Sequence, residues 1–172
     1  MELRAKSAFI VCVVVCASCS GGDDPASGGG GPGDPIGIEE ARPICDRYTA
    51  HEAMCHFEEL PGYDWNCGDG IGAWTETAFR TFAACVTETP CSGDPTACYM
   101  STIDAVPTRD AVLRWSERCE ARWTECGMDP RLIDLRCSAD GWLKLYSDAY
   151  LQMLAACFDE ACDAISTCVE GL

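Results

Sequence analysis

Cysteine is the residue type that offers the most chemistry in this chain. Of its 172 residues 15 are cysteines, a density typical of disulfide-stapled secreted proteins. An even number of cysteines in an exported chain predicts structural disulfides. Zinc binding and thiol redox chemistry remain alternatives, but the twelve cysteines beyond residue 19 contain no Cys-x-x-Cys pair. These twelve form two groups of six, which are Cys45, Cys55, Cys67, Cys85, Cys91 and Cys98, followed by Cys119, Cys126, Cys137, Cys157, Cys162 and Cys168.

The two histidines, His51 and His56, lie in a segment that partly matches the helix of zinc proteases. In that motif the two histidines are four residues apart and share one face of the helix. Here they are five residues apart, which turns them by about 140° from each other on a regular helix. We therefore expect two exposed helix histidines that do not share a metal ion.

Residues 64–70, with the sequence DWNCGDG, partly match a calcium-binding loop. Asp64 and Asn66 fit the first and third ligand positions, and Asp69 supplies a further carboxylate. The required glycine comes one residue late, however, and Thr75 replaces the bidentate glutamate. The pattern favours a polar turn that opens a helix. If the segment binds calcium instead, its candidate ligands are Asp64, Asn66 and Asp69.

The remaining residues form no catalytic constellation. There is no nucleophile elbow, and neighbouring acidic residues such as Glu58 and Glu59 face different ways on a helix. We therefore expect no catalytic residue and no cofactor. The alternative is an enzyme whose site is built from carboxylates with a raised pKa and backbone groups. Trp65 lies in the 64–70 loop, so we expect it to be the most exposed tryptophan and a contact residue.

Apolar residues recur at helical spacing around both cysteine groups. Steps of three and four residues connect the apolar positions in residues 71–85 and in residues 112–126. Similar stripes begin at Ala41 and at Leu143. Pro43 falls near the start of the first of these, where a proline is tolerated. Each stripe predicts a helix with one buried face.

Capping residues set the expected ends of these helices. Thr108 is the expected N-cap of the 112–126 helix, and Gly127 is its expected end. The pairs Asp94-Pro95 and Asp129-Pro130 are typical of the first residues of short helices. No alternating strand pattern of useful length is present. We predict an all-α fold.

The two cysteine groups belong to an internal duplication. The intervals between cysteines are 10, 12, 18, 6 and 7 residues in the first group and 7, 11, 20, 5 and 6 in the second. Neighbouring residues match as well, as in FAAC at 82–85 and LAAC at 154–157. We predict two tandem disulfide-stapled helical hairpin repeats, at residues 38–106 and 107–172. They should share a surface, because the junction between them is short.

We expect the disulfides to form within each repeat, because duplication implies that each unit once folded alone. Cys119 and Cys126 lie on one predicted helix, about 10 Å apart, which is too far for a bridge. Each bridge must therefore join two elements. Six cysteines allow fifteen pairings. A nested pairing, first with sixth and second with fifth, would suit antiparallel helices.

The N-terminal segment has the features of an export signal. Arg4 and Lys6 precede an apolar run over residues 8–17, which is about half the length of a transmembrane helix. This pattern is typical of a secretory signal peptide. We assign residues 1–19 to it.

The end of this signal resembles a bacterial lipobox, in which a cysteine after small residues becomes the lipidated first residue. Here residues 17–19 read Ala-Ser-Cys, and Cys16 stands where leucine is usual. The resemblance implies a lipid anchor on Cys19 and, with the uncharged Ser20 behind it, outer-membrane sorting; ordinary secretory cleavage is the alternative. Residues 20–37 are rich in Gly, Pro and Asp, which predicts a flexible linker.

The charge of the chain narrows the choice of partners. The formal net charge is −16, which argues against nucleic acid and against electrostatic docking on anionic lipid. We expect membrane contact only through the N-terminal lipid anchor. The expected function is a non-enzymatic surface binding module for an unknown protein, glycan or envelope component. The alternatives are a structural envelope lipoprotein without a specific ligand and a calcium-binding protein.

Overall fold

A computed structural model describes residues 31–60 and 65–171, so Cys19 and Asp64 lie outside the described residues. The described chain is helical, without strands but with two isolated antiparallel bridges, which confirms the predicted all-α fold. Its helices are α1 Ile38–Cys55, α2 Glu76–Glu88, α3 Ala97–Ala105, α4 Asp110–Glu125, α5 Pro130–Cys137, α6 Asp148–Ala156 and α7 Ile165–Glu170. Short 3-10 turns are η1 Phe57–Glu59, η2 Cys67–Gly70, η3 Trp142–Leu145 and η4 Cys157–Asp159.

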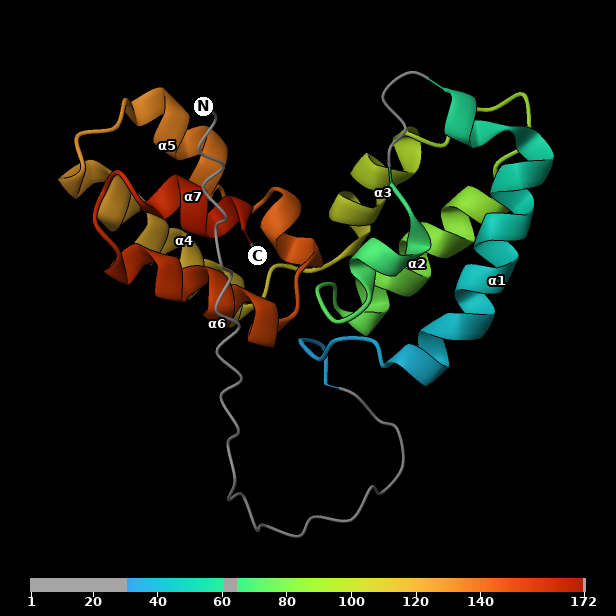
Figure 1. Ribbon diagram of the computed structural model, residues 1–172, viewed down its shortest axis with the longest axis horizontal. Coiled ribbons are helices and arrows are strands. Elements are labelled where there is room, and N and C mark those ends of the chain that lie inside the picture. The colour runs from blue at the N-terminus through green and yellow to red at the C-terminus, as the bar shows by residue number, and fades with distance from the viewer. Residues whose placement is uncertain (1–30, 61–64, 172) are drawn as a thin grey trace, which may run out of the picture.

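The helices form two groups that lie side by side (Figure 1). The first group contains α1, α2 and α3, and the second contains α4 to α7. In each group a long helix packs against a second helix, α1 against α2 and α4 against α6. None of these described helices is long and apolar enough to cross a membrane. The two cores are centred on Tyr48, Phe57, Phe79 and Phe82 in the first group and on Val112, Leu143, Leu151 and Ile165 in the second.

Helices α2 and α6 begin later than their apolar stripes predicted. α2 starts at Glu76 rather than at Ile71, because the Thr75 hydroxyl caps it by accepting from the N–H three residues on, at 3.2 Å. Ser147 caps α6 in the same way, also at 3.2 Å. The apolar residues before each cap lie in turns that continue the buried face, so periodicity alone could not place the helix starts.

The other predicted caps are confirmed in part. Gly127 adopts a φ of 72° just after α4 and ends it, as a glycine can without steric cost. Asp129 caps α5 as predicted, its carboxylate accepting from a backbone N–H at 2.8 Å. The N-cap of α4 is Arg109 rather than Thr108. Asp94 forms a turn, and α3 begins three residues later than Asp94.

Six disulfides join the elements with the same connectivity in both repeats. The first cysteine of each repeat bonds the third, the second bonds the fifth, and the fourth bonds the sixth. Bridging within repeats is therefore confirmed, and the shared pattern supports the duplication. The bridges are Cys45–Cys67, Cys55–Cys91, Cys85–Cys98, Cys119–Cys137, Cys126–Cys162 and Cys157–Cys168.

The nested pairing is correct for the second and fifth cysteines and wrong for the first and sixth. The bridges are set by which helices and turns pack against each other. Cys45 lies near the middle of α1, which packs against η2, and so meets Cys67. Helices α2 and α3 pack on each other, which leaves Cys85 and Cys98 to form the remaining bridge.

Trp65 is not the exposed contact residue that its loop predicted. Its ring is half-buried and packs edge-on against Tyr48, with centroids 5.0 Å apart, and against Phe82 at 4.4 Å. The Cys45–Cys67 bridge holds the loop against α1. Trp65 therefore packs against the core of the first repeat.

The two repeats share a surface, as the short junction predicted. The N-caps of α2 and α6, Thr75 and Ser147, each donate one backbone hydrogen bond to the other repeat at this surface. The Thr75 N–H donates to the Leu145 carbonyl at 2.8 Å, and the Ser147 N–H donates to the Ala73 carbonyl at 2.7 Å. Leu145 belongs to the second repeat but is buried in the core of the first, and Tyr146 contacts both cores.

The folded part of the chain begins inside the predicted 20–37 linker. Ile36 is only 2% exposed and belongs to the first core. The Asp34 carbonyl accepts from the first N–H of α2 at 3.0 Å, and the Gly33 carbonyl accepts from the first N–H of α6 at 2.8 Å. Residues 33–36 thus bind one helix of each repeat and belong to the folded part of the chain rather than to a flexible linker.

Candidate functional site

The candidate calcium ligands are only partly described, and those that are described have another role. Asn66 caps η2: its Oδ1 accepts from the Gly68 N–H at 2.9 Å. Its Nδ2 donates to Asp69 Oδ2 at 2.7 Å. Asp64 lies outside the described residues. Among residues 31–60 and 65–171, no three His, Cys, Asp or Glu side chains are grouped to hold a metal ion.

The two histidines lie in different environments and do not converge. His51, in α1, is half-buried rather than exposed, and its Nε2 lies 2.8 Å from the Thr89 carbonyl oxygen. His56 lies just past the end of α1, with a φ of 57°, and its Nδ1 is 3.7 Å from Glu59 Oε1. Of the expected two exposed helix histidines, His51 is in a helix but is half-buried, because the last turn of α1 packs against the α2–α3 loop. His56 is exposed but lies outside the helix, because α1 ends at Cys55.

All twelve cysteines of the two repeats are in disulfides. None of the twelve is therefore a free thiolate that could bind zinc or attack a substrate. The six bridges indicate an oxidising, extracytoplasmic environment.

A largely apolar cavity lies in the second repeat, and we call it the aromatic pocket. Its volume is about 240 Å³. Trp115 and Trp123 come from α4, two helical turns apart, and so lie on one face of that helix. Trp142 comes from η3 and Phe158 from η4. Cys119, Arg136, Ser166, Val169 and Glu170 complete the lining.

Packing holds the aromatic rings of this pocket in place. The rings of Trp115 and Trp142 meet edge to face, with centroids 6.2 Å apart. Phe158 packs against Trp115 at 5.2 Å. The Arg136 guanidinium lies 5.9 Å from the centroid of the Trp123 ring, in cation–π range. The pocket thus combines rigid aromatic walls with one cationic and one anionic group, Arg136 and Glu170, at exposed positions.

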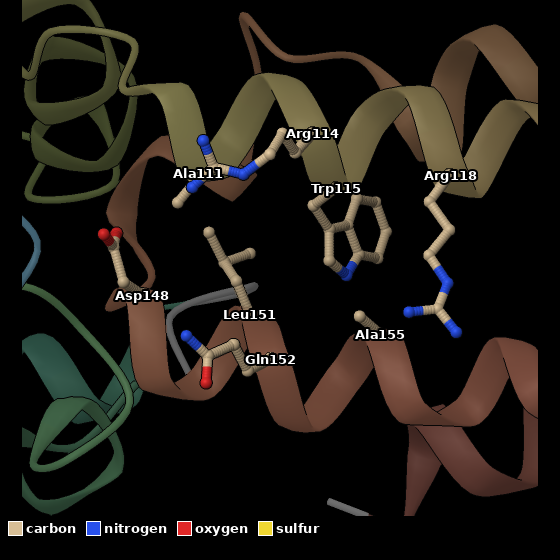
Figure 2. A pocket seen from close by; sticks show the side chains of 8 residues that line it. All are labelled: Ala111, Arg114, Trp115, Arg118, Asp148, Leu151, Gln152 and Ala155. Atoms are coloured by element: carbon tan, nitrogen blue, oxygen red, sulfur yellow. The ribbon is translucent and has the colours of Figure 1, made fainter.

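A second cavity, the α4–α6 groove, lies between these two helices of the same repeat (Figure 2). Its volume is about 210 Å³. Arg114 and Arg118 line it from α4, and Asp148 and Gln152 line it from α6. Trp115 lies between the two helices and is the one residue that lines both the groove and the aromatic pocket.

The groups with shifted pKa values lie outside both cavities. Burial, followed by the nearby phenols of Tyr150 and Tyr99, raises the pKa of Tyr146 to about 12. Burial also raises the pKa of Tyr99. The Thr96 hydroxyl and then its N–H lower the pKa of the exposed Asp94 carboxyl by hydrogen bonding. None of these three groups lines the aromatic pocket or the α4–α6 groove.

The apolar stripe over residues 112–126 predicted a helix with one buried face, which includes Trp115 and Trp123, but it did not predict a cavity there. One signal was available in the duplication. Four residues before the first cysteine of each repeat stand Ala41 and Trp115. Alanine is small and tryptophan is the largest residue, so the helices around this position must pack differently in the two repeats.

No known protein family, curated protein or solved structure matches this chain.

Proposed function

We propose that this protein is a non-enzymatic, exported and lipid-anchored binding module, with its ligand site in the aromatic pocket of the second repeat. The observation that carries the proposal is the pocket itself. Binding pockets for small groups are concave and mostly apolar, with a few polar groups that fix orientation. Trp115, Trp123, Trp142 and Phe158 supply the apolar walls, and Arg136 supplies a charge beside them.

The size of the pocket limits what it can hold. An apolar cavity of about 150 Å³ accommodates benzene, and the aromatic pocket measures about 240 Å³. It therefore suits one ring or two fused rings rather than a whole drug-sized molecule. The ligand would insert one flat apolar group, carried by a protein, a glycan or another envelope component. Its polar part would contact Arg136 and Glu170.

The chemistry of the described residues supports binding over catalysis. The cysteines are consumed in bridges, and the two histidines lie in different environments, one of them bonded to a backbone carbonyl. The pocket wall consists of aromatic carbon with few titratable groups. A flat group packed against these rings gains dispersion and apolar burial without any bond being made or broken.

The lipid anchor is the part of the proposal that depends on the signal sequence. Acylation of Cys19 would tie the mature chain to a membrane, with residues 20–32 as the tether before the folded part begins at Gly33. The acidic surface would keep the rest of the protein away from anionic headgroups. The location in the outer membrane depends on Ser20, and secretion without an anchor is the alternative.

The pocket is tested with p-cresol, a single-ring probe, and the indole N–H signals in nitrogen-edited NMR spectra. We expect p-cresol to shift the signals of Trp123 and Trp142 and to leave those of Trp65 and Trp74, in the first repeat, unchanged. Val169→Phe fills part of the pocket from α7 and should weaken p-cresol binding about tenfold. Leu135→Ala, at a position 72% exposed on α5, is the matched control and should bind normally.

Two results would contradict the pocket as the ligand site. One is a p-cresol titration that shifts no indole signal of the second repeat. The other is equal binding by the Val169→Phe and Leu135→Ala variants. Either would favour a structural envelope lipoprotein without a specific ligand.

A further inference from the structure

We propose that the α4–α6 groove binds the carboxylate of a small apolar anion, with Trp115, Arg114 and Arg118 as the donors. This goes beyond the proposed function, because the groove is a different cavity from the aromatic pocket. Of the residues that line the two cavities, only Trp115 is common to both.

The first observation is an unsatisfied hydrogen-bond donor. Trp115 is only 6% exposed, and its Nε1 is buried without an acceptor among the described residues. In Figure 2 the indole stands between the two helices with Nε1 directed toward α6, near Ala155. Buried donors are almost always paired in native proteins. A ligand oxygen in the groove would supply the missing acceptor.

The second observation is the charge on the α4 side of the groove. Arg114 and Arg118 are one helical turn apart and both line the cavity. Arg118 donates to Asp159 Oδ1 at 2.6 Å, whereas Arg114 forms no ion pair with the described residues. The one carboxylate in the lining, Asp148, is already bound by Arg109 at 3.1 Å. The groove therefore has a cationic side within an acidic protein.

The walls of the groove define the rest of the ligand. Ala111, Leu151 and Ala155 are small or apolar. They line the groove beside the charged side chains (Figure 2). A volume of about 210 Å³ leaves space for a carboxylate with one ring or a short alkyl group. A carboxylate is favoured over a phosphate, because the net charge of −16 repels a dianion more strongly than a monoanion.

The first repeat contains a comparable groove that lacks the indole donor. Arg47 from α1 and Arg80 from α2 line a cavity of about 280 Å³ between those helices. Ala41, fully buried, stands at the position equivalent to Trp115. Arg80 is engaged by Glu76 at 2.7 Å. The duplication thus provides an internal control in which arginines line the groove without a buried N–H.

The test uses benzoate as the probe, with benzamide as its neutral counterpart and inorganic phosphate as a second anion. The Trp115 indole signal is assigned by its loss in Trp115→Phe. We expect benzoate to move this signal downfield, because its proton enters a charge-assisted hydrogen bond. Benzamide and phosphate should leave it in place. Arg114→Gln should weaken benzoate binding about tenfold, whereas Arg47→Gln should have no effect.

Several outcomes would overturn the carboxylate site. These are no movement of the Trp115 signal with benzoate, equal movement with benzamide or with phosphate, and equal weakening by Arg114→Gln and Arg47→Gln. If Trp115→Phe alters the fold, the comparison of Arg114→Gln with Arg47→Gln decides the question. Both arginines are exposed, so their replacement does not disturb a core. Val169→Phe, which fills the aromatic pocket, should leave benzoate binding intact, so failure of one site is distinguishable from failure of the other.

Discussion

The backbone of Gly33 lies directly against the carboxylate of Asp148. The Gly33 carbonyl accepts a hydrogen bond from the Asp148 N–H at 2.8 Å, and a Cβ on residue 33 would lie 2.5 Å from Asp148 Oδ1. A heavy atom cannot occupy that space without displacing the Asp148 carboxylate, which Arg109 holds at 3.1 Å. The segment before α1 therefore docks on the second repeat through a close approach that only glycine permits.

Replacing Gly33 with alanine should weaken this docking. We expect Gly33→Ala to lower the free energy of unfolding by about 2 kcal/mol, because the added methyl group forces apart the segment and the Asp148 side chain. Urea unfolding followed by circular dichroism measures the change. Gly37→Ala is the control: its Cβ would meet nothing closer than 3.8 Å. Equal losses in the two variants would show that the close approach has no energetic weight.

Arg109 should be the most sensitive charged residue for stability. Its side chain is 9% exposed, and it donates to Asp148 Oδ1 and to the carbonyls of Lys144 and Tyr146. Arg109→Ala leaves these acceptors without donors, which should cost about 3 kcal/mol in thermal or urea unfolding. Arg109→Lys should recover little, because a point charge cannot make three divergent bonds. Arg42→Ala, at an exposed site, should change stability by less than about 0.5 kcal/mol.

The disulfide connectivity can be read from non-reduced peptide maps. We expect linked peptides that pair the first cysteine with the third, the second with the fifth and the fourth with the sixth in each repeat. A peptide that joins the two repeats would contradict the fold.

The bridges should also differ in how much they stabilise. Cys126–Cys162 closes a separation of 36 residues and Cys157–Cys168 one of 11. Loop-closure entropy then predicts losses of about 4 and about 3 kcal/mol when each pair is replaced by serine. Equilibrium unfolding of the two double variants measures both. The reverse order would show that native-state contacts, rather than the unfolded chain, set the effect.

The phenol of Tyr146 should titrate later than an ordinary tyrosine. Burial first, and the neighbouring phenols next, raise its pKa to about 12 in the folded protein, against about 10 in an unfolded chain. The neutral form is favoured by folding, so this contribution to stability is complete below about pH 10 and is lost as the pH rises toward 12. Tyrosinate absorbance should show a late step that Tyr146→Phe removes. A late step that persists in this variant would assign it to another phenol.

The membrane anchor depends on one cysteine. When the full chain is expressed in a Gram-negative host, we expect the protein to fractionate with membranes and to incorporate labelled palmitate. Cys19→Ala should abolish the label and release the protein, because the thiol is the acylation site. If the unaltered protein is released from the membrane as fully as the Cys19→Ala variant, and both are cleaved near residue 19, the protein is secreted in the ordinary way.

The duplication and the helical class could be predicted from the sequence, because both depend on local spacing. Apolar steps of three and four residues predict helices wherever they occur, and α4 lies where its stripe placed it. Two sets of six cysteines at matching intervals predict two units that close their own bridges. Spacing did not place the helix starts after the caps Thr75 and Ser147, because the apolar pattern continues through the turns before them.

The bridge partners, the burial of Trp65 and the two cavities were decided only by the tertiary structure. Spacing states how far apart residues are along the chain but not which elements become neighbours. Cys45 meets Cys67 because η2 packs on α1, and the same contact buries Trp65. Trp115 lines both cavities of the second repeat, whereas Ala41 is fully buried at the equivalent position of the first. A large ring there changes how helices pack, and packing is a property of the assembled chain.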